Sequence, residues 1–187
     1  MSKILVVVDM QNDFITGCLG NEECRACVDR VVSVLKNGGY RHVFVTRDTH
    51  ADNYLQTQEG KNLPVVHCIE NTEGWEIHPK VLKALKEEYN EEQITFLNKD
   101  TFGSRELGVK IAAYAKESGT DPVVHFVGVC TGICVISNVM ITKAFNPELP
   151  VKVIADACAC VTKESHETAL NAMKTCQVEI IYEEEWV

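Results

Sequence analysis

Long hydrophobic runs are absent from this sequence. Its first residues, MSKILVVVDMQNDF, contain one lysine and a short apolar stretch that Asp9 and Asp13 interrupt. A secretory signal needs a longer apolar region than this, and a membrane-spanning helix needs about 20 consecutive apolar residues. We therefore expect a cytoplasmic protein that does not associate with a membrane.

Positive charge is also scarce. The chain has 18 lysines and arginines against 27 aspartates and glutamates, which gives a formal net charge of -9 at pH 7. Nucleic acids and anionic membrane surfaces attract basic proteins, so this balance argues against both as partners. The negative charge favours neutral or cationic substrates over anionic ones. It is compatible with a homo-oligomer.

Cysteine, by contrast, is plentiful. The chain has nine cysteines, an odd number, and without a secretory signal they indicate free thiols in a reducing compartment. The spacing of Cys18, Cys24 and Cys27 resembles a metal-binding cluster, but the last two fall within a helical pattern and no second CxxC pair follows. We interpret these three residues as packing residues.

Short apolar stretches alternate with helical patterns along the chain. Nearly continuous apolar stretches rich in β-branched residues are typical of strands buried on both faces of a parallel sheet. We predict strands at residues 4–8, 42–46, 94–97, 123–127, 151–154 and 178–181. We predict helices at residues 22–36, 79–89, 105–117, 134–145 and 164–174. The alternation predicts one domain over residues 1–187, a three-layer α/β/α sandwich around a parallel six-stranded sheet.

One segment, residues 47–78, does not fit this alternation of strands and helices. A loop of about thirty residues inside a compact domain is usually functional. Asp48 and His50 form a D-x-H pair at the end of a predicted strand, and Glu59 and His67 follow. Two imidazoles and two carboxylates suit zinc, manganese or iron(II), and a bound metal would keep the loop ordered. The alternative is that they are polar side chains of a surface loop, and spacing alone favours that alternative.

Other chemically capable residues also follow predicted strands. In open α/β sheets, ligands bind beyond the carboxyl ends of the strands. Asp9, Lys99 and the turn GVCTGICV at residues 128–135 are expected at that edge. Cys134 lies where this turn gives way to a helical pattern, so the helix N-terminus and Lys99 can stabilise its thiolate.

Together these residues could form the active site of an enzyme with a cysteine nucleophile. Asp9 can accept the thiol proton and later return it to a leaving amine. The backbone N–H groups of Cys130 and Cys134 can stabilise an oxyanion. The alternative is an ordinary buried ion pair of Asp9 with Lys99, beside two cysteines that only pack.

Six stretches of the sequence form a recognisable pattern. They are VVVDMQNDF, TRDTHADNYL, LPVVHCIENTEGWEIHP, NKDTFGS, GVCTGICV and DACACVTKESHETAL, and they follow one another over nearly the whole chain. This pattern resembles the isochorismatase-like cysteine hydrolase superfamily, and within it the nicotinamidases. The resemblance implies the same α/β fold and an enzyme that acts on a small-molecule amide.

The resemblance also implies roles for single residues. By it, Asp9 is the base, Lys99 its charge partner and Cys134 the nucleophile. It implies a cis peptide bond before Cys130, which turns the N–H of that residue toward the oxyanion. Phe14 matches a position that contacts the substrate ring.

A metal site is implied in the same way. The metal ligands of nicotinamidases carry over onto Asp48, His50 and His67. Glu59 fits the variant in which a glutamate takes the place of a further histidine. The implied cofactor is a divalent ion, zinc first, with manganese or iron as alternatives.

Two positions depart from the family pattern. Gly132 stands where the family turn, GVxTDxCV, commonly has an aspartate. Leu63 and Pro64 stand near the place where many nicotinamidases carry an aromatic residue that stacks on a pyridine ring. The second departure bears on the identity of the substrate.

Together these features predict a metal-assisted cysteine amidohydrolase. The first choice is a nicotinamidase of NAD salvage, which converts nicotinamide and water to nicotinate and ammonia through a thioester on Cys134. One alternative is an amidase for a carbamoyl or ureido compound. Another is an isochorismatase-type hydrolase, against which Cys134 argues because vinyl-ether cleavage needs no cysteine nucleophile. A receiver-like binding module would explain the acidic residues and lysine, but not Cys134 or the metal loop.

Overall fold

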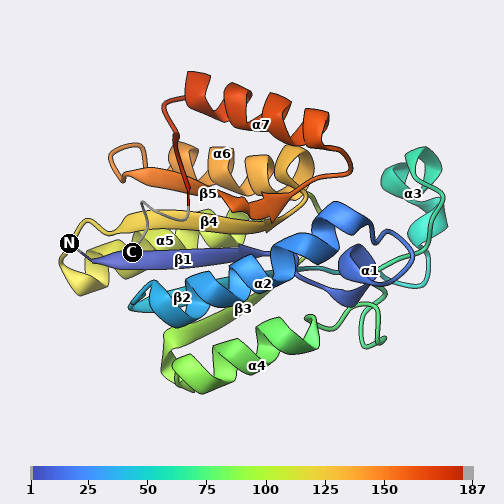
Figure 1. Cartoon of the computed structure of the whole chain (residues 1–187), viewed down its shortest axis with the longest axis horizontal. Helices are drawn as coiled ribbons and strands as arrows, with labels where there is room; N and C mark the ends of the chain where they lie inside the picture. The colour runs from blue at the N-terminus through green and yellow to red at the C-terminus, as the bar shows by residue number, and fades with distance from the viewer. Residues whose placement is uncertain (1, 183–187) are drawn as a thin grey trace.

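The structure, a computed structural model, describes residues 2–182 (Figure 1). In this part of the chain six strands form one sheet in the order β3-β2-β1-β4-β5-β6, and all neighbouring strands are parallel. They are β1 (Lys3–Val8), β2 (His42–Asp48), β3 (Ile94–Lys99), β4 (Val123–Val129), β5 (Val151–Ala159) and β6 (Glu179–Ile181). The predicted parallel sheet is confirmed, although β5 continues to Ala159 instead of ending at residue 154.

Helices cover both faces of this sheet. On one face pack α2 (Glu22–Asn37) and α4 (Pro79–Glu88), and on the other pack α5 (Arg105–Ser118), α6 (Ile136–Phe145) and α7 (Lys163–Thr175). The predicted three-layer arrangement is therefore confirmed. Shorter segments are α1 (Asn12–Ile15), η1 (Tyr54–Gln56), α3 (Gln58–Asn62), η2 (Glu91–Gln93) and η3 (Thr131–Val135). Within residues 2–182, no helix has the length and apolar character needed to cross a membrane.

The position of β1 between two layers of helices explains why its sequence is continuously apolar. Leu5 and Val7 of β1 face the layer of α2 and α4, whereas Ile4, Val6 and Val8 face the layer of α5, α6 and α7. All five side chains are fully buried. Because side chains of a strand alternate between its faces, a strand covered on both sides needs apolar residues at every position.

The turn after β4 differs from its prediction. The sequence predicts a helix that starts at residue 134, but α6 starts at Ile136 and follows η3, a single turn of π-helix. The N–H of Val135 donates to the carbonyl of Cys130 at 3.1 Å, across five residues. This longer spacing widens the turn, so Cys134 lies inside it and not at the start of a regular helix.

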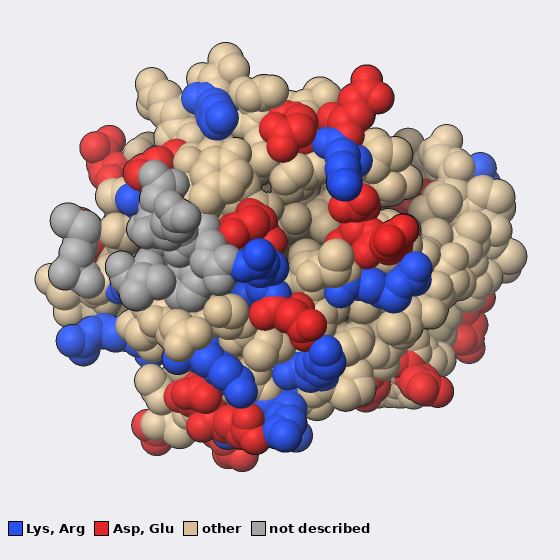
Figure 2. Space-filling model, in the orientation of Figure 1, with Lys and Arg blue, Asp and Glu red and all other residues tan. Residues whose placement is uncertain are grey.

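Acidic and basic side chains are interspersed on the face of the molecule shown in Figure 2. Surface ion pairs such as that of Lys80 with Asp29, at 2.7 Å, belong to this mixed pattern of charge. Basic groups on the face of Figure 2 therefore have acidic neighbours and do not gather into one patch.

Candidate active site

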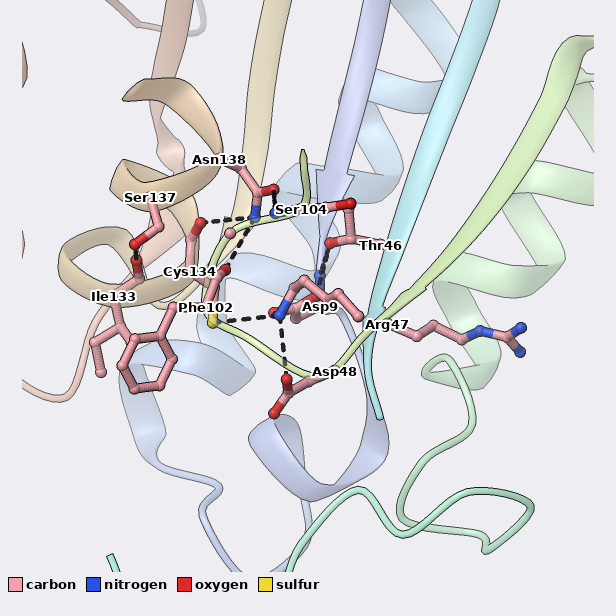
Figure 3. Close-up of polar contacts among 12 residues, drawn as sticks. Asp9, Thr46, Arg47, Asp48, Phe102, Ser104, Ile133, Cys134, Ser137 and Asn138 are labelled. Atoms are coloured by element: carbon pink, nitrogen blue, oxygen red, sulfur yellow. Dashed lines mark hydrogen bonds and ion pairs between the residues drawn. The ribbon is translucent and has the colours of Figure 1, made fainter. Parts of the chain in front are cut away.

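The carboxyl ends of β1, β2 and β3 and the turn after β4 bring the predicted catalytic residues together. Lys99 Nζ lies 2.6 Å from Asp9 Oδ2 and 3.7 Å from Cys134 Sγ. It also lies 3.2 Å from Asp48 Oδ1. All four side chains are buried, Asp9 completely. Figure 3 shows Asp9, Asp48 and Cys134 converging on this point, so the sheet edge places a thiol, a carboxylate and a cation in contact.

Asp9 is held in place from two sides. Thr46 Oγ1 donates to its Oδ1 at 2.6 Å, while Lys99 pairs with its Oδ2. Its backbone has a φ of 48°, a conformation that aspartate adopts more readily than bulky residues. Burial raises the pKa of Asp9 and the charge of Asp48 adds to the rise, whereas Lys99 and Thr46 oppose it. The carboxylate therefore binds a proton more readily than an exposed aspartate, as a general base should.

The thiol of Cys134 is favoured over the thiolate in this arrangement. Burial raises its pKa well above the usual value, Asp9 and Asp48 raise it further, and Lys99 lowers it. The sequence suggested that the helix N-terminus and Lys99 would stabilise a thiolate, but full burial outweighs them. Removal of the proton therefore depends on a base next to the sulfur, and Asp9 interacts with the thiol directly.

The backbone around Cys134 is built on a close approach of two strands. The peptide bond between Val129 and Cys130 is cis, as the family resemblance implies. Gly128 has a φ of 118°, and a Cβ there would collide with the carbonyl oxygen of Val8 in β1. Only glycine fits this position, which explains why the turn GVCTGICV starts with one.

Asn138 of α6 joins this turn to the loop after β3. Its Nδ2 donates to the carbonyls of Cys134 at 2.8 Å and Phe102 at 3.2 Å, and its Oδ1 accepts the N–H of Ser104 at 2.9 Å (Figure 3). The side chain is fully buried. Asn138 was not predicted from the sequence, and its signal is an asparagine on the buried face of a helix.

The four predicted metal ligands also come together. Asp48, His50, Glu59 and His67 each offer one donor atom, and these atoms lie within 4.8 Å of one another. The Nε2 atoms of His50 and His67 lie 3.0 and 3.5 Å from Asp48 Oδ2, and 3.7 and 3.8 Å from Glu59 Oε1. His67 Nδ1 lies 2.8 Å from the carbonyl of Val65, which directs Nε2 toward the group. Two imidazoles and two carboxylates in this arrangement could hold a divalent metal ion, and we call these four residues the metal group.

Asp48 connects this group to the predicted catalytic residues. Its Oδ1 faces Lys99 and its Oδ2 faces His50 and His67. Burial alone would raise the pKa of Asp48, but hydrogen bonds from the two histidines and the charge of Lys99 lower it. One ionised carboxylate therefore belongs to both groups.

Gln11 fixes the long segment that carries the metal group. Its Nε2 donates to the carbonyls of Asp48 at 2.8 Å and Trp75 at 2.9 Å, and its Oε1 accepts the N–H of Asp48 at 2.7 Å. Asp13 Oδ2 accepts the N–H of Cys68 at 2.7 Å. Gln11 was not predicted from the sequence, and its signal is a polar residue shortly after a buried strand.

A cavity of about 690 Å³ opens beside the metal group. Its lining includes the apolar side chains of Leu63, Phe102 and Ile133 along with His50 and Glu59. Cavities that combine apolar surface with polar groups are typical of sites for small molecules. The cavity therefore offers space for a small molecule beside His50 and Glu59, and its lining residues Asp100 and Ile133 are the chain neighbours of Lys99 and Cys134.

Phe14, the predicted ring contact, packs against the metal group. Its ring meets the His67 ring edge-on, with centroids 5.5 Å apart. It is partly buried and packs against the core on the side of α2 and α4. Phe14 therefore lies next to a predicted metal ligand.

The sequence matches a family model and a known enzyme over nearly its whole length. The model of the isochorismatase family, described as the isochorismatase domain, matches residues 3–185. The nicotinamidase/pyrazinamidase of Mycobacterium tuberculosis (strain ATCC 25618 / H37Rv) is 27% identical over 185 residues, which cover 96% of this chain and 98% of that protein.

Solved structures show the same similarity. A nicotinamidase from Bacillus subtilis is 25% identical, with a TM-score of 0.80 and coverage of 96% of this chain and 99% of that chain. A pyrazinamidase from Pyrococcus horikoshii in complex with zinc is also 25% identical, with a TM-score of 0.76 and coverage of 97% and 99%. Each similarity extends over nearly the whole length of both proteins.

Proposed function

Because the chain belongs to the isochorismatase family, we propose that it is a cysteine amidohydrolase that converts nicotinamide and water to nicotinate and ammonia. The observation that carries this proposal is the contact of Lys99 with both Asp9 and Cys134 in one buried site. A nucleophile, a base and a fixed positive charge then lie within reach of one substrate carbon. The similarity to nicotinamidases and pyrazinamidases supports a pyridine carboxamide or a close analogue as substrate.

The reaction begins at the Cys134 thiol. Asp9 accepts its proton while the sulfur attacks the amide carbon, and the raised pKa of Asp9 favours that transfer. The backbone N–H groups of Cys130 and Cys134 donate to the oxyanion that forms. The C–N bond then breaks, Asp9 returns the proton to the departing nitrogen, and ammonia leaves a thioester on Cys134.

Water completes the reaction. Asp9, again a carboxylate, takes a proton from the water molecule that attacks the thioester. The C–S bond breaks, nicotinate leaves, and Asp9 returns its proton to the sulfur of Cys134. Burial would lower the pKa of Lys99, but Asp9, Cys134 and Asp48 raise it, so Lys99 stays a cation throughout.

We assign metal binding to the group that combines Asp48, His50, Glu59 and His67. Their donor atoms and their close spacing fit a divalent ion, zinc first, with manganese or iron as alternatives. When bound, the ion would act as a Lewis acid that holds the pyridine nitrogen and orients the ring. Phe14, which packs against His67, would contact that ring.

Removal of the metal is expected to lower turnover strongly. Treatment with a chelator should lower ammonia release from nicotinamide by about a hundredfold, since the substrate ring loses its anchor, and added Zn²⁺ should restore it. Metal analysis of His50→Ala should show loss of the ion, whereas the control His42→Ala, whose imidazole contacts Thr95 instead, should keep it. Full turnover by protein free of metal would contradict the metal assignment.

Thr46 is expected to set the acid limit of activity. Asp9 must be ionised to accept the thiol proton, and its pKa is raised above the usual aspartate value of 3.8, so kcat/KM should fall as pH drops through that raised value. The Thr46 hydrogen bond lowers the pKa of Asp9. Thr46→Val should therefore move the acid limit upward by about one pH unit.

The control for this shift is Thr46→Ser, which keeps the hydroxyl. Its pH profile of kcat/KM should match that of the wild-type protein. An acid limit that stays in place or moves downward in Thr46→Val would show that Asp9 is not the group that titrates.

A second candidate is an amidase for carbamoyl or ureido compounds. The observation that favours it is Leu63 in the cavity wall, because an aliphatic side chain suits non-aromatic amides as well as rings. Ammonia release from nicotinamide, pyrazinamide and small ureido acids, measured on one sample, decides between the two. A higher kcat/KM for a ureido acid would favour the second candidate.

We further propose that the enzyme works in the cytoplasm and supplies nicotinate for NAD salvage. All nine cysteines are free in the structure. Free thiols of this number fit a reducing compartment.

A further inference from the structure

Five of the nine cysteines gather on the side of the catalytic turn that faces α2 and α7. Cys24 and Cys27 belong to α2, Cys130 follows β4, and Cys158 and Cys160 lie at the end of β5. Cys27, Cys158 and Cys160 line a cavity of about 310 Å³. The proposed hydrolysis uses none of these five sulfur atoms.

Cys130 and Cys160 are neighbours across two adjacent strands. Val129 of β4 pairs with Ala159 of β5, so the next residue of each strand lies beside the other. Neighbouring strands run about 4.8 Å apart, and disulfides join Cα atoms that are roughly 4.4–6.8 Å apart. The Cys130 thiol also contacts the thiols of Cys160 and Cys24 directly. The strand register and the contact between the two thiols therefore place this pair side by side, as a disulfide requires.

Cys160 has the surroundings of a reactive thiolate. Its sulfur lies beside the Cys130 thiol, the Ser165 side chain and the backbone of Gly132 and Val161. These contacts, led by that of Cys130, lower the pKa of Cys160 to about 5 although the side chain is buried. Thiolates, and not thiols, react with peroxides.

Small molecules can approach this sulfur from two sides. Cys160 lines the cavity of about 310 Å³ beside α2, and it also lines a second cavity of about 610 Å³ beside Gly132 and α7. Its own exposure is only 3%, so a compact oxidant such as hydrogen peroxide can reach it more easily than a bulky disulfide.

We propose that Cys160 is a peroxide-reactive thiol whose oxidation closes a disulfide with Cys130. The Cys160 thiolate attacks one oxygen of hydrogen peroxide, which gives a sulfenic acid on Cys160 and releases hydroxide, protonated to water. The Cys130 sulfur then attacks the sulfenic sulfur, loses its proton, and displaces the second oxygen as water. In sum, two thiols and one peroxide give one disulfide and two water molecules.

The disulfide would act on the active site through the backbone of Cys130. This consequence rests on the proposed function, in which the Cys130 N–H donates to the oxyanion. Cys130 also accepts the N–H of Val135 within the turn that carries Cys134. A bond from Cys130 to β5 is expected to displace this turn, so oxidation should slow amide hydrolysis and dithiothreitol should restore it.

The test is a disulfide map of the full-length protein after limited treatment with hydrogen peroxide. Free thiols are alkylated, and the protein is cut with trypsin without reduction. The expected product joins peptide 117–143, which contains Cys130 and Cys134, to peptide 153–163, which contains Cys158 and Cys160. This product should form in Cys134→Ala and be absent from Cys160→Ser.

Cys176→Ser is the matched control, because Cys176 is an exposed cysteine at the end of α7. It should give the same linked peptides as the wild-type protein. Linked peptides that persist in Cys160→Ser, a link from Cys130 to Cys24, or oxidation confined to Cys134 would each overturn the proposal. Circular dichroism checks that Cys160→Ser is folded, and Cys160→Ala replaces it if it is not.

Activity provides a second readout. Under peroxide, Cys160→Ser should lose ammonia release about tenfold more slowly than the wild-type protein, because the reactive thiolate is gone. Equal rates of loss would show that the disulfide does not control turnover. If no amide is hydrolysed at all, the proposed function fails, whereas the disulfide map still tests the thiol pair.

Discussion

Replacement of Cys134 by alanine is expected to lower ammonia release from nicotinamide by roughly 10⁴-fold or more, since no thioester can form. Cys134 is the cysteine in contact with Lys99, at 3.7 Å, and it interacts with Asp9. Steady-state ammonia release measures the effect, and metal analysis of the same samples shows whether the metal group is intact.

Cys130→Ala is the control for this variant. Its sulfur packs toward Cys24 and Cys160, away from the Lys99 contact, while its backbone N–H survives the substitution. We expect Cys130→Ala to keep most of the turnover. Equal loss in the two variants would show that the nucleophile has been assigned to the wrong thiol.

The substitution Asp9→Asn is expected to lower kcat by about 10³–10⁴-fold, because the amide cannot take a proton from the thiol. Burial favours the thiol form of Cys134, so the sulfur has no other route to a nucleophile while Lys99 stays a cation. KM should change much less, because Asp9 is fully buried and does not line the cavity. Steady-state kinetics separate the two constants.

Asp29→Asn is the matched control for Asp9→Asn. Asp29 pairs with Lys80 on the surface, and 78% of its side chain is exposed. It should leave kcat unchanged. Thermal unfolding shows that Asp9→Asn is folded, since Lys99 keeps Asp48 as a partner at 3.2 Å. A kcat within threefold of the wild-type value, about 0.65 kcal/mol of barrier, would contradict the role of Asp9 as the base.

The sequence was sufficient to predict that Asp9, Lys99 and Cys134 lie together, because the fold class has a simple rule. Parallel strands point their carboxyl ends to one edge, so residues that follow different strands meet there even when far apart in the chain. Asp9 and Lys99 are 90 positions apart in number, yet their side chains lie 2.6 Å apart. The continuous apolar runs identified the strands, and the strand ends identified the site.

Residues that act through tertiary contacts were not accessible in this way. Thr46 lies within a predicted strand, and its hydroxyl matters only because β2 lies beside β1 at Asp9. Gln11 and Asn138 each join segments that are distant in sequence. Their polar atoms are buried and satisfied by backbone groups, a property that depends on the folded structure.

The burial of the cysteines and the backbone conformation of Gly132 could be determined only from the structure. Cys24 and Cys27 are buried, as expected of packing residues, but Cys18 is exposed, and its interpretation as a packing residue is wrong. Gly132 has no positive φ, and a Cβ there would make ordinary contacts with Ala169 and the Cys160 sulfur. The backbone therefore does not require glycine at position 132, and the departure from the family aspartate lies beside Cys160.

The most direct test of the Cys134 thioester is product analysis in the presence of hydroxylamine. Hydroxylamine competes with water for a thioester, so part of the nicotinamide should appear as nicotinohydroxamate in proportion to the hydroxylamine added, and Cys134→Ala should form none. If ammonia is released from nicotinamide while nicotinate remains the sole product at every hydroxylamine concentration, water attacks the amide directly and Cys134 is not the nucleophile.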